Sequence, residues 1–132
     1  MSNELYIKIT EILLTLGIKP KMAGFDYLRS AIGLHYNNAE HYEKVTTVIY
    51  PKVGKEYNIT EDLVERSIRM VIVEAHENGG LLGVNELFDQ IVFKNNYLLS
   101  NGEFIAIVAE VIRLQEIRNM LNVAGCKMQG IN

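Results

Sequence analysis

The chain has 132 residues, of which 48% are hydrophobic and 22% are charged, and its formal net charge at pH 7 is −3. This length is sufficient for one domain with its own hydrophobic core and is too short for two such domains. No apolar run approaches the roughly 18 residues that a membrane span needs, and no signal peptide opens the sequence. The single cysteine, Cys126, excludes an internal disulfide, so we expect a cytoplasmic protein with no membrane partner.

Apolar residues in the first fifty positions recur at the spacing of amphipathic helices. The spacing predicts one helix over residues 5–16, which Gly17 ends, and a second over residues 25–36. A third, short helix is predicted over residues 42–49, where it leads to Pro51. With only two prolines in the chain, this periodicity predicts an all-α fold.

Residues 50–78 predict a short helix, a tight turn and a longer helix. Pro51 suits a first helical position, Asn58 tolerates the backbone angles of a turn, and Thr60 is a good N-cap. The longer helix is predicted to end at residues 78–80, Asn-Gly-Gly. Its core-facing stripe is Val64, Ile68, Val71, Ile72 and Ala75. This pattern is typical of a helix-turn-helix, in which the second helix enters the DNA major groove.

The opposite side of the longer helix carries the candidate DNA-contacting residues. An arginine there can donate two hydrogen bonds to guanine, a glutamate can accept one from cytosine, and apolar side chains can contact thymine methyl groups. The predicted base contacts are Glu65, Arg66, Arg69 and Met70. On and after the short helix, Lys52, Lys55 and Thr60 are predicted to contact phosphates.

The C-terminal third predicts the longest helix. Ser100 and Glu103 form a capping box at its start, and the helix is expected to continue to about Leu121. This gives a single helical domain over residues 1–121 and a flexible tail over residues 122–132. The last helix is interpreted either as a central core helix or as a homodimer seam formed by Ile117, Met120 and Leu121. The segment at residues 91–93, Ile-Val-Phe, is apolar enough for a brief strand, a packed loop or a partner surface.

Several segments in collinear order, from about residue 9 to residue 116, resemble a known family. The central pieces are residues 45–51 (VTTVIYP), 55–60 (KEYNIT) and 64–69 (VERSIR), and the flanking ones are residues 12–20, 24–32 and 101–110. Together they resemble the DNA-binding effector domain of the stage-zero sporulation response regulator family. The resemblance implies a compact bundle of about six helices with the helix-turn-helix at its centre. It also implies sequence-specific binding to double-stranded promoter DNA, often as tandem dimers.

The resemblance places Glu65, Arg66 and Arg69 where the family has base-contacting and backbone-contacting side chains. The chain departs from the family at Leu63, where arginine is usual, and at Met70 and Val73, where histidine and glutamate are usual. It also begins at Met1 without room for the receiver domain found upstream in full-length members. If complete, it would not be switched by aspartyl phosphorylation in cis.

The acidic net charge favours an alternative function. Residues 44–69 carry five basic and four acidic side chains, so the predicted contact region is close to neutral, whereas DNA-binding surfaces are usually basic. The apolar residues Leu63, Met70 and Val73 would then serve a protein-interaction module derived from a DNA-binding domain. A third interpretation of the arginines is a solvated helix face, with Arg66 paired to Asp62.

Motifs for catalysis and for metal binding are scarce. The spacing of His35, His41, His76 and Cys126 does not match a zinc site. The sequence has no phosphate-binding loop and no nucleophile elbow. We therefore expect neither a metal nor a cofactor, and we do not expect an enzyme.

Overall fold

The computed structural model describes residues 1–38, 44–87 and 97–131, and it leaves out the side chains at positions 84, 87 and 126–131. These residues form helices and contain no strand, which confirms the predicted all-α fold. The elements in chain order are α1 (Asn3–Thr15), α2 (Ala23–Asn37), the π-helical turn η2 (Val45–Ile49), α3 (Tyr50–Tyr57), α4 (Glu61–Glu77), the 3₁₀ turn η3 (Gly80–Leu82), α5 (Gly83–Leu87) and α6 (Asn101–Ile131).

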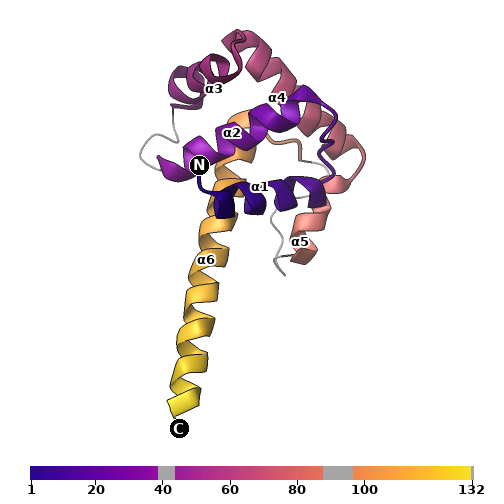
Figure 1. Cartoon of the computed structure of the whole chain (residues 1–132). Coiled ribbons are helices and arrows are strands. Elements are labelled where there is room, and N and C mark those ends of the chain that lie inside the picture. The colour runs from indigo at the N-terminus through magenta and orange to yellow at the C-terminus, as the bar shows by residue number, and fades with distance from the viewer. Residues whose placement is uncertain (39–43, 88–96, 132) are drawn as a thin grey trace.

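Helix α2 lies at the centre of the body, where it packs against α1, α4 and α6. In Figure 1, α3 and the start of α4 lie at one end of the body, and the C-terminal part of α6 projects from the other end. The surface of α3 and the start of α4, which carries predicted DNA contacts, is therefore well separated from the C-terminal part of α6.

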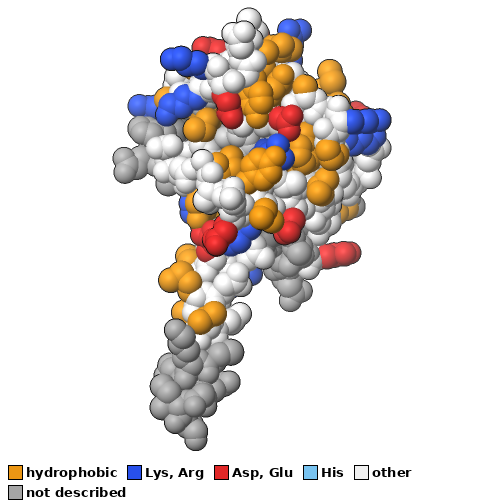
Figure 2. Space-filling view, viewed as in Figure 1, with side chains coloured by type: hydrophobic (Ala, Val, Ile, Leu, Met, Phe, Trp, Pro, Cys, Tyr) orange, Lys and Arg blue, Asp and Glu red, His pale blue; other side chains and the backbone are white. Residues whose placement is uncertain are grey.

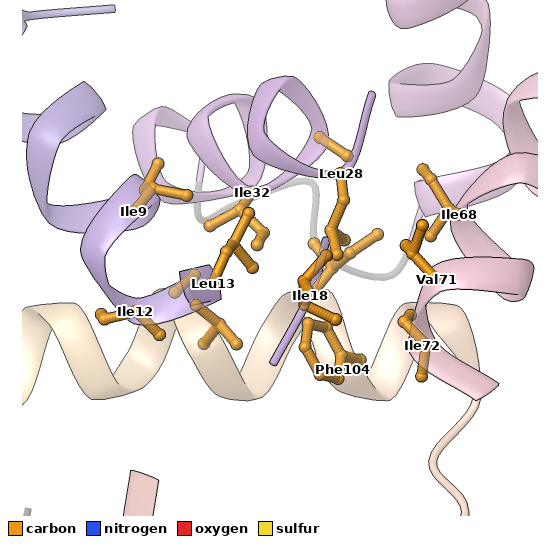
Figure 3. Packing of buried hydrophobic residues seen from close by; sticks show 14 of the residues in the cluster. Ile9, Ile12, Leu13, Ile18, Leu28, Ile32, Ile68, Val71, Ile72 and Phe104 are labelled. Atoms are coloured by element: carbon orange, nitrogen blue, oxygen red, sulfur yellow. The ribbon is translucent and has the colours of Figure 1, made fainter. Parts of the chain in front are cut away.

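One hydrophobic core joins the helices. Figure 3 shows Phe104 of α6 beneath Ile18 and Leu28, with Ile72 of α4 beside it. Each of these four residues is at most 2% exposed. Burying a side chain of this size contributes about 1.5–3 kcal/mol, so the core is the main source of stability.

The end of α1 follows the sequence prediction. Gly17 adopts a left-handed conformation with φ of 78°, and the Ile18 amide donates to the Leu13 carbonyl at 3.0 Å. This is the Schellman arrangement, in which the glycine ends the helix and the following apolar residue packs inward. Ile18 is 2% exposed, so the chain turns back into the core at this point.

Two predicted boundaries differ from the structure. The short third helix expected over residues 42–49 is the π-helical turn η2, which continues directly into α3, and residues 39–43 lie outside the described part. The last helix does not end near Leu121 but continues to Ile131. The glycines at positions 125 and 130 favoured an earlier end, but a glycine inside a helix costs only about 1 kcal/mol. The flexibility of residues 122–132 stays a prediction, and the segment at residues 91–93 lies outside the described residues.

Candidate nucleic-acid interface

The turn between α3 and α4 is built from three residues with distinct roles. Asn58 adopts the left-handed conformation with φ of 55°, and the Ile59 amide donates to the Gly54 carbonyl at 2.9 Å. A Cβ at Gly54 would lie 2.8 Å from the Ile59 carbonyl oxygen, so only glycine fits there without a backbone shift. The turn is therefore tight and fixes how α4 leaves α3.

Helix α4 begins as the sequence predicted. The Thr60 hydroxyl accepts a hydrogen bond from the Leu63 amide at 3.2 Å, which confirms the N-cap. Glu61 and Asp62 occupy the first turn, where the helix dipole favours negative charge. The predicted inner stripe is fully confirmed, because the buried residues of α4 are Val64, Ile68, Val71, Ile72 and Ala75.

Most of the predicted contact residues are exposed. Glu65 and Arg66 are exposed on α4, and the side chain of Met70 is 61% exposed. Lys52 and Lys55 are exposed on α3. Figure 2 shows Lys and Arg side chains gathered at the end of the body where α3 lies. One inward-facing stripe on α4 thus leaves the opposite face available to a ligand.

Arg69 differs from the other predicted contacts. It is half-buried, and its Nη1 donates a hydrogen bond of 2.7 Å to the carbonyl oxygen of Leu99. The guanidinium is therefore tied to the segment that precedes α6. A guanidinium carries five N–H groups, so the remaining groups can still serve another acceptor.

The apolar residues of the predicted alternative are unequally exposed. Leu63 is 39% exposed and Met70 is 61% exposed, whereas Val73 is half-buried. Val73 therefore contributes less to the outer surface than the sequence suggested, and the exposed apolar pair is Leu63 and Met70.

An open hollow lies beside Glu65 and Arg69, where the start of α3 and the start of α6 approach α4. Its lining includes Tyr50, Glu65, Arg69, Asn101 and Glu103. The Asn101 side chain is buried and donates from Nδ2 to the Glu65 carbonyl oxygen at 3.1 Å. This second tie joins α6 to α4, and nothing in the sequence pattern predicted it.

Burial raises the pKa of the Tyr50 hydroxyl at this hollow, and a hydrogen bond with the Asn101 side chain partly offsets the rise. Tyr50 is 4% exposed, so it acts as a core residue, and its hydroxyl stays protonated near neutral pH. The buried Tyr50 and Asn101 thus line the hollow together with the charged residues Glu65, Arg69 and Glu103.

The predicted capping box at the start of α6 is confirmed. The Ser100 hydroxyl accepts from the Glu103 amide at 3.2 Å, and Glu103 Oε1 accepts from the Ser100 amide at 3.1 Å. The Tyr97 hydroxyl donates to Glu103 Oε2 at 2.9 Å. The Ser100 amide and the Tyr97 hydroxyl lower the pKa of the Glu103 carboxyl, which keeps the cap charged.

Across residues 1–38, 44–87 and 97–131, the side chains that the structure describes form no group of three or more His, Cys, Asp or Glu suited to a metal ion. Within the same part of the chain, no helix is long and apolar enough to cross a bilayer.

An all-helical body that buries one side of a long helix and exposes arginine on the other is an arrangement that helical DNA-binding domains share with other helical proteins. Comparison with known families is more specific, because residues 9–112 match the family described as Sporulation initiation factor Spo0A C terminal. The chain belongs to this family, whose members are DNA-binding domains of sporulation regulators and not enzymes. This confirms the resemblance stated from the sequence. Residues 113–131, where α6 continues, lie outside the match.

Proposed function

We propose that the chain is a sequence-specific transcriptional regulator that binds promoter DNA through a helix-turn-helix. In this proposal α3, the turn at Asn58 and α4 form the motif at one end of a bundle of about six helices, and not at its centre as the resemblance implied, and α4 enters the major groove. The observation that carries the proposal is the division of α4 into a fully buried stripe and an exposed face with Glu65, Arg66 and Met70.

Each exposed residue has a role that its chemistry permits. Arg66 would donate two hydrogen bonds to a guanine, and Glu65 would accept one from a cytosine. Met70 would contact a thymine methyl group, where the family usually has histidine. Lys52, Lys55 and Thr60 would bind phosphates and set the orientation of the domain without selecting the sequence.

Arg69 has two roles in this proposal. One part of its guanidinium holds the Leu99 carbonyl, and the remaining N–H groups face a base or a phosphate. Its position is therefore more rigid than that of Arg66, which lowers the entropy cost of binding.

The net charge of −3 limits the strength of binding. A small number of lysine and arginine contacts releases few counterions from the DNA, so the affinity is modest. It falls with added salt, because counterion release gains less free energy at a higher salt concentration. We propose a cytoplasmic location, since the regulator acts on chromosomal DNA, and a homodimer through the C-terminal helix, where Ile117, Met120 and Leu121 are exposed.

Titration of a labelled duplex with the intact chain and with Arg66→Ala and Arg69→Ala tests the proposal. Each change should weaken specific binding by about 1–3 kcal/mol and relax the preference at one base pair. Lys21→Ala, at an exposed position before α2, is the control and should bind as the intact chain does. Equal affinities of all four proteins for specific and unrelated duplexes would reject the proposal.

A second candidate is the protein-interaction module, which the exposure of Leu63 and Met70 favours. This candidate predicts that Met70→Glu abolishes binding to a protein partner and that the intact chain shows no salt-sensitive DNA binding. If the variant instead loses only DNA binding, the first candidate is favoured.

A further inference from the structure

Two asparagine–glycine pairs occur in the chain, at residues 78–79 and at residues 101–102. In such a pair the main-chain nitrogen of the glycine can attack the carboxamide carbon of the asparagine, because glycine has no side chain that hinders a close approach. The reaction converts the carboxamide into a carboxylate, and water is its only co-reactant. The two pairs have the same sequence, so the structure around each pair decides which of them can react.

The first pair lies at the exposed end of α4. Asn78 directly follows the helix, and both Asn78 and Gly79 are exposed. Within the part of the chain that the structure describes, the Asn78 carboxamide makes no hydrogen bond. Gly79 adopts the left-handed conformation with φ of 72°, and no neighbouring part of the chain lies within 4 Å of where its Cβ would be. The first pair therefore has room to change its local conformation.

Attack at the first pair requires only a local opening. The nitrogen reaches the carboxamide after rotation about the Asn78 ψ angle, which is 2° in the structure. The Gly79 amide donates to the His76 carbonyl oxygen at 3.1 Å, and this bond must open first. The bond belongs to the last turn of α4, and the ends of helices open at little cost in free energy. Because glycine accepts many backbone conformations, Gly79 can compensate for the rotation before the chain reaches Gly80.

The second pair is held in place by the fold. Asn101 is 8% exposed, and its Nδ2 donates to the Glu65 carbonyl oxygen at 3.1 Å. Asn101 is also the first residue of α6, and Phe104, three residues later, is fully buried. A rotation at Asn101 would displace Phe104 from the core, so the second pair can react only when the domain unfolds.

We propose that Asn78 is a site of spontaneous deamidation in the folded protein and that Asn101 is not. The Gly79 nitrogen forms a bond to the Cγ atom of Asn78, the Cγ–Nδ2 bond breaks, and the carboxamide nitrogen leaves as ammonia with the proton of the Gly79 amide. Water then opens the cyclic imide that has formed. Opening at Cγ gives aspartate, whereas opening at the main-chain carbonyl carbon gives isoaspartate, in which the main chain runs through the former side chain. No oxidant or reductant is required.

Either product should weaken the end of α4. A new carboxylate at position 78 lies beside Glu77 at the negative end of the helix dipole, where negative charge is unfavourable. Isoaspartate also lengthens the main chain just before Gly80, where a Cβ would lie 2.4 Å from the Leu16 carbonyl oxygen. This close contact leaves no room for a shift of the chain toward α1, so the end of α4 should separate from the end of α1.

Two variants test the effect on stability. Asn78→Asp carries the charge of the ordinary product, whereas Asn78→Gln is neutral, and its longer side chain closes the ring less readily. Asn78→Asp should have the lower urea midpoint of unfolding at neutral pH, and added salt should reduce the difference between the two variants. Equal midpoints at low salt would overturn the weakening of α4.

Incubation of the intact chain at mildly alkaline pH, followed by peptide mapping with mass spectrometry, tests the site itself. A second sample is incubated in guanidinium chloride at the same pH. In the folded chain, aspartate and isoaspartate should accumulate at position 78 several-fold faster than at position 101, whereas in the denatured chain the two positions should convert at similar rates. Equal rates in the folded chain, or no conversion at position 78, would overturn the proposal. A difference that persists in the denatured chain would also overturn it, because the flanking sequence would then be the cause.

Discussion

Arg69 of the proposed recognition helix donates a hydrogen bond of 2.7 Å from Nη1 to the main-chain carbonyl of Leu99. Together with the bond from Asn101 Nδ2 to the Glu65 carbonyl, it fastens the start of α6 to the middle of α4. Helix α4, which we propose to enter the groove, is therefore fixed by hydrogen bonds to the first residue of α6 and to the segment just before it.

Removing the Arg69 tie should destabilise the domain. Arg69→Met keeps much of the apolar stem and leaves the Leu99 carbonyl without its charged donor, so the free energy of unfolding should fall by about 1–3 kcal/mol. Urea denaturation followed by circular dichroism measures the change. Met70→Ala, one position along and 61% exposed, should stay within about 0.5 kcal/mol of the intact chain. Equal denaturation midpoints for all three proteins would show that the bond contributes nothing.

The two lysines of α3 should affect the salt dependence of DNA binding more than its sequence preference. Removal of one phosphate-binding side chain reduces the magnitude of the slope of log K against log salt by about 0.9. Lys52→Ala and Lys55→Ala should each show this reduction with an unchanged base preference, measured by fluorescence anisotropy at several salt concentrations. The Lys21→Ala control should keep the slope of the intact chain. A changed base preference in either α3 variant would assign that lysine to base recognition instead.

The close approach of α2 to α4 depends on Gly24. A Cβ at this position would lie 2.2 Å from the Ser67 carbonyl oxygen and 2.9 Å from the Val71 Cγ1 atom. Gly24→Ala should therefore push α4 away from α2 and destabilise the domain by about 1–3 kcal/mol, read from thermal or urea unfolding.

Gly125→Ala is the matched control for this change. Gly125 lies within α6 with no atom close to where its Cβ would be, so alanine should be neutral or stabilising by up to about 1 kcal/mol. If Gly24→Ala proved as stable as Gly125→Ala, the packing of α2 on α4 would be looser than described.

Stability should fall in mild acid because of His35. Burial, and then the neighbouring positive charge of Arg113, lower the pKa of the His35 imidazole, while Glu110 opposes them weakly. The unfolded chain takes up a proton near pH 6.5 and the folded chain resists it, so this contribution is complete above about pH 6.5 and is lost progressively below it. Urea midpoints measured between pH 7.5 and about pH 5 should decline.

His35→Gln should decline less over that range than the intact chain does. His76→Gln, at the end of α4, is the control and should keep the decline of the intact chain. The same slope in all three proteins would remove His35 as its cause.

The local features of the interface were predictable from the sequence because they depend on neighbouring residues. The Thr60 cap, the turn at the left-handed Asn58 and the Ser100–Glu103 box each involve groups at most five positions apart. The buried stripe of α4 followed from its period alone. Such features are set by backbone chemistry and need no knowledge of the tertiary fold.

The ties between α4 and α6 were not predictable in this way. Arg69 and Leu99 are thirty positions apart, and Asn101 and Glu65 are thirty-six apart. No spacing rule connects such pairs, so Arg69 resembled a free surface arginine in the sequence.

Selection of bound sequences from a random duplex pool, performed with the intact chain at two salt concentrations, tests the central claim most directly. The account predicts a defined enriched motif at low salt, weaker recovery at higher salt, and loss of preference at one base pair in Arg66→Ala. A pool that stays random at both salt concentrations would contradict the claim that α4 binds DNA specifically.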